Sequence, residues 1–254
     1  MNKLIVSIIV LLLILLALGL GYRFFNDDLN KIEEIKEDIP VIEEIIEPTI
    51  EPEPTVEPEK TINTDMFYDL DSILILVNKK HDLPSDYEPS DLVKPNVKSN
   101  KSGLSLRQEA ALAIEEMFNK ALEDDITLVL GSSYRSYSYQ SKLYNNYVAK
   151  DGEEKANKYS AKPGQSEHQT GLAADISDAS GANYLKQSFK DTPEGIWLKD
   201  NAHNFGFILR YPEGKEEITG YMFEPWHFRY VGIEEATKIY NSNLTFEEYY
   251  NILD

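Results

Sequence analysis

The chain has 254 residues, enough for one domain of ordinary size plus appendages. It contains no cysteine, which excludes disulfides, Cys-rich zinc sites and a thiol nucleophile. Its net charge of −19 argues against a nucleic-acid partner, because phosphate binding needs a basic face. Any metal must therefore be held by carboxylates and by the four histidines, which are His81, His168, His203 and His227.

The first 25 residues contain a segment directed to the membrane. Residues 4–20 include one polar residue, Ser7, and this length is near the lower limit for a membrane span. We expect residues 1–25 to be a transmembrane anchor; the alternative is a signal peptide that is cleaved near Gly19 or Gly21. On either alternative we expect the rest of the chain to be extracytoplasmic, tethered by a single pass or secreted.

Residues 26–65 predict a disordered linker. Between Asp27 and Lys60 there are 13 acidic residues against 3 lysines, and Glu-Pro pairs recur through the second half. Proline blocks helix continuation and like charges repel, so we expect an extended spacer. Most of the acidity lies here, which leaves the following residues only mildly acidic.

Residues 66–254 have the composition of a globular domain, and the order of their patterns predicts an α+β fold. We expect a small, largely antiparallel sheet with flanking helices and a functional site at strand ends. A helix is expected to start at Ser105, with Gln108 three residues on as in a capping box, and further helices are expected at 137–148, 192–205 and 245–253. Strands are expected at 126–130, 172–177, 207–210 and 221–230.

Two stretches carry residues suited to a zinc site. Ser166 to Asp175 reads Ser-Glu-His-Gln-Thr-Gly-Leu-Ala-Ala-Asp, and Glu224 to His227 reads Glu-Pro-Trp-His. A catalytic zinc site keeps three protein ligands and leaves one position for water. His168, Asp175 and His227 would supply two imidazoles and a carboxylate, if the two stretches meet in space.

Hydrolysis at such a site needs further groups. Glu224 is the candidate to accept the proton of the zinc-activated water and to deliver it to the leaving amine. Residues three apart on a strand face opposite sides, so we expect a bend at Pro225 to bring Glu224 and His227 together. Arg135, just after a predicted strand, could stabilise the oxyanion.

The same residues also allow a plainer interpretation, in which the histidines are structural and hold no metal. His81 lies in a Lys-Lys-His-Asp run typical of a solvated surface. His203 lies in the helix expected at 192–205, where we expect it to pack against the core or to lie on the surface. Residue chemistry alone leaves the structural interpretation and the zinc hydrolase both open.

Three motifs in this order resemble the VanY-type D-alanyl-D-alanine carboxypeptidases, zinc peptidases of the LAS group. They are Tyr-Arg-Ser-x-x-x-Gln, Ser-x-His-x-x-Gly-x-x-x-Asp and Glu-Pro-Trp-His, and the resemblance covers about residues 76–232. It implies Zn²⁺ on His168, Asp175 and His227, with Glu224 and Arg135 in the catalytic roles given above. It also implies that Gln140 and Ser166 line the site of the substrate's terminal D-alanine.

The substrates that this resemblance implies are peptidoglycan stem peptides or their precursors, which agrees with an exported, membrane-tethered protein. We expect removal of the terminal D-alanine from D-Ala-D-Ala. Cleavage of an L,D bond in tetrapeptide stems is the first alternative, since relatives of both kinds share these motifs. A non-catalytic, zinc-stabilised wall-binding module is the second, and a metal-free adaptor is the third.

Overall fold

The computed structural model describes residues 64–253, so the anchor predicted at 1–25 and nearly all of the linker predicted at 26–65 lie outside the described residues. Within residues 64–253, no helix is both long enough and apolar enough to cross a membrane. The boundaries predicted for the three parts of the chain therefore stay predictions.

Four short strands form the central sheet in the order β3-β4-β6-β5, and each neighbouring pair is antiparallel. A second sheet pairs two strands of two residues each. The α+β class with a small antiparallel sheet is thus confirmed for the described residues. The strands are β1 (Leu92–Val93), β2 (Leu106–Arg107), β3 (Leu128–Ser132), β4 (Ala173–Asp178), β5 (Phe207–Leu209) and β6 (His227–Tyr230).

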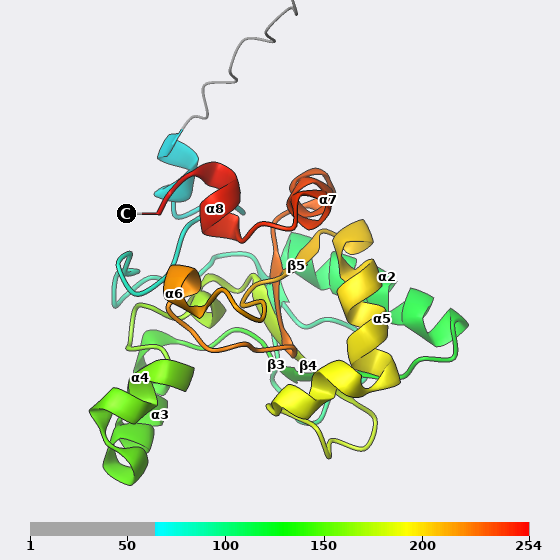
Figure 1. The fold of residues 1–254 in the computed structure, drawn as a ribbon, viewed down its shortest axis with the longest axis horizontal. Coiled ribbons are helices and arrows are strands. Elements are labelled where there is room, and N and C mark those ends of the chain that lie inside the picture. Colours follow the sequence, from blue (N-terminus) through cyan, green and yellow to red (C-terminus); the bar gives the residue numbers. More distant parts are fainter. Residues whose placement is uncertain (1–63, 254) are drawn as a thin grey trace, which may run out of the picture. The chain divides into compact units, whose positions relative to one another are not determined.

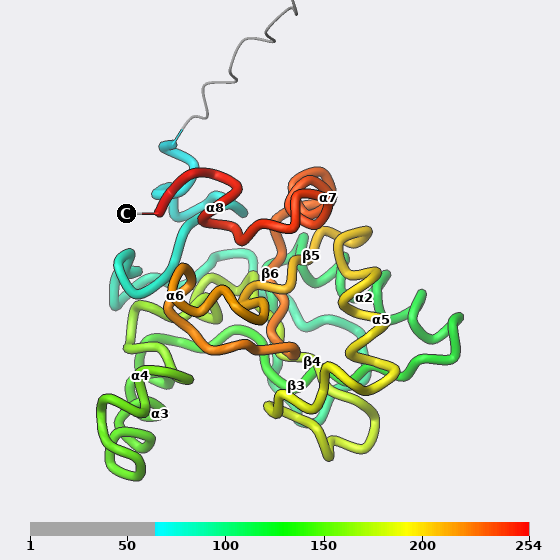
Figure 2. Tube along the Cα trace, in the orientation of Figure 1, coloured from blue at the N-terminus to red at the C-terminus, as the bar shows by residue number. Residues whose placement is uncertain are grey.

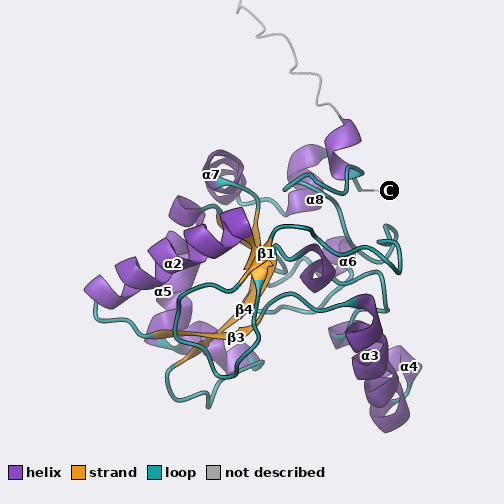
Figure 3. Ribbon diagram, turned by 180° about the vertical axis from the view of Figure 1, so that it is seen from behind, coloured by secondary structure: helices purple, strands orange, loops and turns teal. Residues whose placement is uncertain are grey.

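Helices flank this sheet (Figure 1). In Figures 1 and 3, α2 and α5 lie on one side of the sheet, whereas α3 and α4 pack together on the other side. The helices are α2 (Gln108–Glu123), α3 (Tyr137–Asp151), α4 (Glu153–Tyr159), α5 (Pro193–Asn201), α6 (Glu216–Thr219), α7 (Ile233–Ser242) and α8 (Phe246–Tyr250). The 3-10 turns are η1 (Thr64–Phe67), η2 (Glu167–Thr170), η3 (Gln187–Asp191) and η4 (Ala202–Phe205).

The two ends of the described chain lie side by side, as the tube in Figure 2 shows for η1 and α8. Phe67 of η1 packs its ring against Phe246 and Tyr250 of α8, at centroid distances of 6.0 and 4.8 Å. These rings belong to a small apolar core that is separate from the main core between the sheet and α2. The C-terminal helix is thereby fixed against the rest of the domain.

Helix α2 confirms its predicted apolar face but not its predicted start. Ala110, Ile114 and Met117 are fully buried, as their helical spacing requires. The predicted cap at Ser105 is wrong, because Ser105 donates its backbone N–H to the Ser133 hydroxyl and the helix begins only at Gln108. The residues between them pair with β1 instead, so a tertiary contact replaces the local cap.

Gly171 explains how the stretch from Ser166 to Asp175 folds back on itself. It has a φ of +68°, a left-handed conformation that side chains disfavour, and it joins η2 to β4. A Cβ atom at this position would lie 2.8 Å from Leu92 Cδ2 and 3.1 Å from Arg107 Cγ. The glycine therefore permits the tight turn that places η2 and β4 next to each other.

Candidate active site

Asp175 and His227 are direct partners across two neighbouring strands. Asp175 lies on β4 opposite His227 on β6, so their side chains project from the same face of the sheet. The carboxylate oxygen Oδ1 of Asp175 lies 3.1 Å from Nδ1 of His227. Register alone therefore brings together two residues that are 52 positions apart in the chain.

His168 reaches the same point from η2. Its Nδ1 donates a hydrogen bond of 2.7 Å to the carbonyl of Ser133, which fixes the proton on that nitrogen. Its Nε2 lies 3.2 Å from Asp175 Oδ1 and is buried without a hydrogen-bond partner. A buried nitrogen with a free lone pair is what a metal ligand requires.

The donor set fits a divalent metal ion. One ligand atom from each of His168, Asp175 and His227 lies within 4.8 Å of the others, and all three residues are buried. Two imidazoles and one carboxylate are a common catalytic zinc set. We call these three residues the metal cluster. The predicted meeting of the two sequence stretches is thus found in the structure.

The protonation of the two imidazoles differs. Burial lowers the pKa of His168 to about 4, which keeps its ring neutral. Burial also opposes the charged form of His227, but hydrogen bonds with Asp175 and Glu167 outweigh it and raise the pKa to about 9. A metal at Nδ1 of His227 must therefore displace a proton.

Glu224 does not lie on a strand, so the strand predicted for residues 221–230 is wrong over its first six residues. Strand β6 begins at His227, and a turn precedes it in which the His227 N–H donates to the Glu224 carbonyl. This turn brings Glu224 Oε2 to 3.9 Å from His227 Nδ1. Burial raises the pKa of the Glu224 carboxyl to about 8. The bend expected at Pro225 is present, as a turn before the strand.

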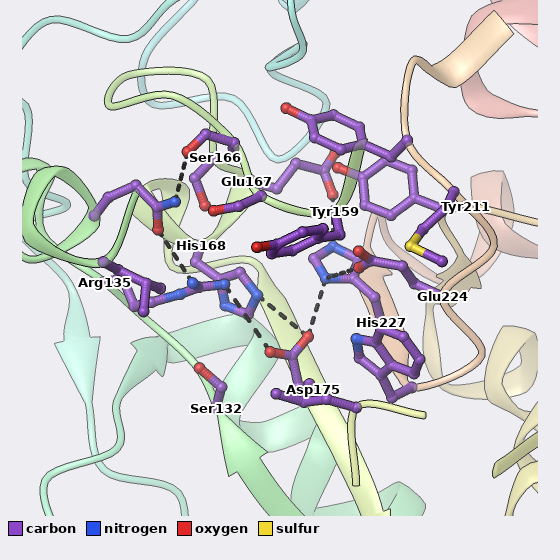
Figure 4. Close-up of a pocket in the computed structure, with 18 of the residues that line it drawn as sticks. Ser132, Arg135, Tyr159, Ser166, Glu167, His168, Asp175, Tyr211, Glu224 and His227 are labelled. Carbon is purple, nitrogen blue, oxygen red and sulfur yellow. Dashed lines mark hydrogen bonds and ion pairs between the residues drawn. The ribbon is translucent and has the colours of Figure 1, made fainter. Parts of the chain in front are cut away.

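Arg135 lies on the opposite side of the metal cluster from Glu224, as Figure 4 shows. Its Nη2 is 4.0 Å from Asp175 Oδ2, and its Nη1 donates a 3.1 Å hydrogen bond to the Gln140 side chain. Gln140 in turn donates to the carbonyl of Ala161 at 2.7 Å. Gln140 therefore accepts one hydrogen bond and donates another within the protein, and it orients Arg135.

All seven predicted site residues line one cavity of about 760 Å³. Ser166 lies on its wall, and its hydroxyl has no hydrogen-bond partner among the described residues. The cavity walls also carry aromatic rings that the sequence analysis did not single out, which are Tyr139, Tyr147, Tyr159, Tyr184, Tyr211 and Tyr221. This volume is typical of a small-molecule or peptide site.

Glu167 is the residue that sequence reasoning missed. It is buried, and its Oε2 lies 3.1 Å from Nε2 of His227, on the side of the ring away from Asp175. Burial alone would raise its pKa, but Arg210 and Arg229 reverse this and hold the pKa well below its usual range. The available signal was an arginine in each of the two strands predicted at 207–210 and 221–230, since a buried cation requires a buried carboxylate.

The two remaining histidines lie apart from this cavity, as predicted. His81 hydrogen-bonds within its own turn, with Nδ1 3.1 Å from the Asn78 side chain. His203 stacks on Tyr240 at a centroid distance of 3.7 Å. A groove of about 850 Å³ next to His203 is larger than the site cavity but contains none of the metal-cluster residues.

Comparison with known proteins agrees with this geometry. The family model VanY, D-alanyl-D-alanine carboxypeptidase, matches residues 103–233, which include the whole metal cluster, Glu224 and Arg135. The chain belongs to the VanY family. It is 48% identical to the protein YodJ of Bacillus subtilis (strain 168) over 184 residues, which cover 71% of this chain and 67% of YodJ.

Two solved structures show the same fold. The LdcB LD-carboxypeptidase matches with a TM-score of 0.69 and 46% identity, over 73% of this chain and 88% of LdcB. A mutant of the vancomycin-resistance D,D-pentapeptidase VanY in complex with Zn(II) matches with a TM-score of 0.57 and 34% identity, over 69% of this chain and 97% of that protein.

Proposed function

We propose that this VanY-family protein is a zinc-dependent carboxypeptidase that removes the terminal D-alanine from D-Ala-D-Ala stem peptides of peptidoglycan. The observation that carries the proposal is the arrangement around the metal cluster. Two imidazoles and a carboxylate open onto a peptide-sized cavity, with a buried carboxylate on one side and an arginine on the other. A structural metal site or a binding module needs neither of these flanking groups.

The metal cluster would hold Zn²⁺ through Nε2 of His168, a carboxylate oxygen of Asp175 and Nδ1 of His227. In each histidine the other ring nitrogen is already engaged by Ser133 or Glu167. When bound, Zn²⁺ supplies a Lewis acid that polarises a carbonyl and lowers the pKa of water toward about 7. A VanY relative has been solved with Zn(II), which supports this choice of metal.

Glu224 is the general base and acid of this proposal. Its carboxylate is buried beside His227 and faces the same cavity, so it can take a proton from the attacking water and pass it to the departing D-alanine amine. The turn at Pro225 fixes its position through two backbone hydrogen bonds, one to Tyr211 and one to His227. Fixed placement of this kind lowers the cost of reaching the transition state.

Arg135 would stabilise the negative charge that develops on the substrate carbonyl oxygen. Its guanidinium lines the cavity, and Gln140 holds it from one side. Its Nε is buried without a partner within residues 64–253, so the group retains donor capacity. Ser166 also keeps a free hydroxyl on the cavity wall, where it can bond the terminal D-alanine.

Cleavage of an L,D bond in tetrapeptide stems is a second candidate, and one observation favours it. The LdcB LD-carboxypeptidase shares 46% identity and the fold with this chain, compared with 34% for the zinc-bound VanY. The two reactions share the metal, the base and the scissile D-alanine. They differ only in the residue that precedes the cleaved bond.

Mass spectrometry of the products separates these activities. The full chain, purified in detergent, is incubated with synthetic pentapeptide and tetrapeptide stems, with and without a zinc chelator. The proposal expects loss of one D-alanine from the pentapeptide alone, and no loss with chelator present. Loss from the tetrapeptide supports the L,D candidate. Zinc binding without cleavage of either peptide would leave only a binding module.

We further propose that residues 1–25 anchor the protein in the cell membrane with residues 66–254 outside the cytoplasm. The apolar run at residues 4–20 and a substrate class found in the cell wall support this placement. Protease added to intact, wall-stripped cells should then degrade residues 66–254. Protection of this part in intact cells, with degradation only after lysis, would exclude the proposed orientation.

A further inference from the structure

In each histidine of the metal cluster, the ring nitrogen that points away from Asp175 has a hydrogen-bond partner. The two partners are different kinds of group. His168 Nδ1 donates to the neutral carbonyl of Ser133, at 2.7 Å. His227 Nε2 lies 3.1 Å from the carboxylate of Glu167. A carboxylate accepts a stronger hydrogen bond than a carbonyl and makes the opposite nitrogen a better metal ligand. The contact with Glu167 therefore holds the His227 ring with Nδ1 toward Asp175.

The two oxygens of Glu167 have separate partners. Oε1 accepts hydrogen bonds from Arg210 Nε at 2.7 Å and from Arg229 Nη1 at 2.9 Å. Oε2 is thereby left for His227. Because the two guanidinium groups fix the orientation of the carboxylate, its reach to His227 depends on where they lie.

Arg210 is positioned by the C-terminal helix. Glu247 of α8 accepts two hydrogen bonds from Arg210, from Nη1 at 2.8 Å and from Nη2 at 2.6 Å. Phe246, the preceding residue, places its ring 5.4 Å from the guanidinium of Arg210 and 5.9 Å from that of Arg229. Helix α8 lies outside residues 103–233, the part that the VanY family model matches.

We call Glu167, Arg210, Arg229 and Glu247 the ion-pair cluster. All four residues are buried, and their two positive and two negative charges cancel. Glu167 Oε2 therefore accepts from Nε2–H of His227, and Nδ1 of the same ring lies on the side of Asp175. Loss of Glu247 would leave an excess positive charge beside Glu167 and draw its carboxylate toward Arg210.

We propose that Glu167 is a positioning residue that directs Nδ1 of His227 to the metal, and that Glu247 of the C-terminal helix holds Glu167 in place through Arg210. The inference rests on the proposed zinc site. It connects helix α8 to the metal site through the side chains of Arg210, Glu167 and His227.

The test measures metal binding directly. Zinc affinity of the full chain in detergent is determined by competition with a chromophoric chelator, and the visible spectrum of the Co²⁺-substituted protein reports the ligand set. Glu167→Gln should weaken zinc binding by roughly 10- to 100-fold and shift the cobalt spectrum. Glu247→Gln should act in the same direction by roughly 3- to 10-fold, since its effect passes through Arg210.

Glu248→Gln is the matched control. Glu248 is the next residue on α8, and it pairs with Lys215 and caps the helix, a role that glutamine retains. This variant should bind zinc like the wild type. The double variant of Glu167 and Glu247 should bind no more weakly than Glu167→Gln alone, because both changes interrupt one chain of contacts.

The outcomes separate this inference from the proposed function. If the wild-type protein binds no zinc, the proposed zinc site itself fails. If it binds zinc and Glu247→Gln matches Glu248→Gln, the inference is wrong and Glu247 serves stability alone. The inference is also wrong if the double variant loses zinc affinity by the product of the two single fold-changes, because the two glutamates would then act independently. Should Glu247→Gln not fold, Glu247→Asp keeps the charge but shortens the side chain that holds Arg210 through two hydrogen bonds, so it must still weaken zinc binding.

Discussion

The metal cluster and the ion-pair cluster meet at His227, and they differ in how completely their polar atoms are paired. Every carboxylate of the ion-pair cluster accepts a hydrogen bond of 2.6–2.9 Å from a guanidinium group. In the metal cluster, His168 Nε2 has no hydrogen-bond partner, and the neighbouring Arg135 Nε also lacks one. The two regions are equally buried, so burial does not account for the difference.

The metal cluster therefore has atoms left to bind a ligand, whereas the ion-pair cluster holds neighbouring side chains in position. A buried polar group without a partner costs about 1–3 kcal/mol, and a ligand bound in the site cavity would remove that cost for His168 Nε2 and Arg135 Nε. A fully paired network instead limits motion, because every displacement breaks a hydrogen bond. The comparison predicts that changes in the metal cluster act on binding and activity, whereas changes in the ion-pair cluster act first on folding.

The largest effect is expected from Asp175→Asn, which removes the one carboxylate ligand at nearly constant size. We expect activity to fall by roughly 10³-fold or more, since the charge stabilisation supplied by the metal is lost. Zinc at 1,000 times its Kd should stabilise the wild type by about 4 kcal/mol, and this gain should vanish in the variant. Thermal unfolding with and without zinc measures it.

Asp178→Asn is the control for this change. Asp178 lies on the same strand but points into the following loop, where it binds Ser180 and Asn183. Its variant should keep the stabilisation by zinc. If Asp175→Asn also kept it, Asp175 would not be a ligand.

Glu224→Gln should separate chemistry from metal binding within the same cavity. We expect kcat to fall by roughly 10²- to 10⁴-fold, the usual contribution of a positioned general base, while zinc content stays at the wild-type level. Metal analysis of the purified variant and its steady-state rate on the pentapeptide are the two measurements. Substantial remaining turnover would show that another group serves as the base.

Arg210→Met should act first on folding, whereas Asp175→Asn and Glu224→Gln act on metal binding and activity. Removing one member of a buried ion-pair network leaves uncompensated charge and costs about 3–5 kcal/mol. We expect that loss in the free energy of unfolding of the zinc-free protein, measured with urea. Lys190→Met, which breaks the solvent-exposed pair with Glu213, should change it by less than about 0.5 kcal/mol. Similar values for the two variants would contradict the comparison.

Residue chemistry pointed to the two stretches of the metal cluster but left a structural interpretation open, and the resemblance of three ordered motifs to the VanY family then implied the ligands. Only four histidines are present, and two of them, His168 and His227, lie in the Ser-x-His-x-x-Gly-x-x-x-Asp and Glu-Pro-Trp-His motifs. Strands β4 and β5 and the apolar face of α2 were also predictable, since each follows a local pattern of hydrophobicity. These features require no knowledge of distant contacts.

The features that were missed depend on tertiary contacts. Strand β2 forms only because β1 lies beside it, so the start of α2 moved from Ser105 to Gln108. The strand predicted from Tyr221 failed because Glu224 begins a turn whose bonds go to Tyr211 and His227. The role of Glu167 was not predictable from its neighbours, because Arg210 and Glu247 are distant in sequence.

The smallest effect is expected from Gln140→Met, and it distinguishes two roles for this side chain. The VanY resemblance implies a contact with the terminal D-alanine, whereas the structure shows both ends of the Gln140 amide engaged, with Arg135 and Ala161. If Gln140 mainly orients Arg135, methionine should lower kcat by roughly tenfold and change KM little, because one hydrogen bond to a charged donor is worth about 1.5 kcal/mol or more. If Gln140 instead contacts the substrate directly, losing that contact should raise KM at nearly constant kcat.

Ser166→Ala is the matched comparison, since the free Ser166 hydroxyl on the cavity wall predicts that this variant raises KM. If both variants raised KM alone, Gln140 would have to leave Ala161 when substrate binds.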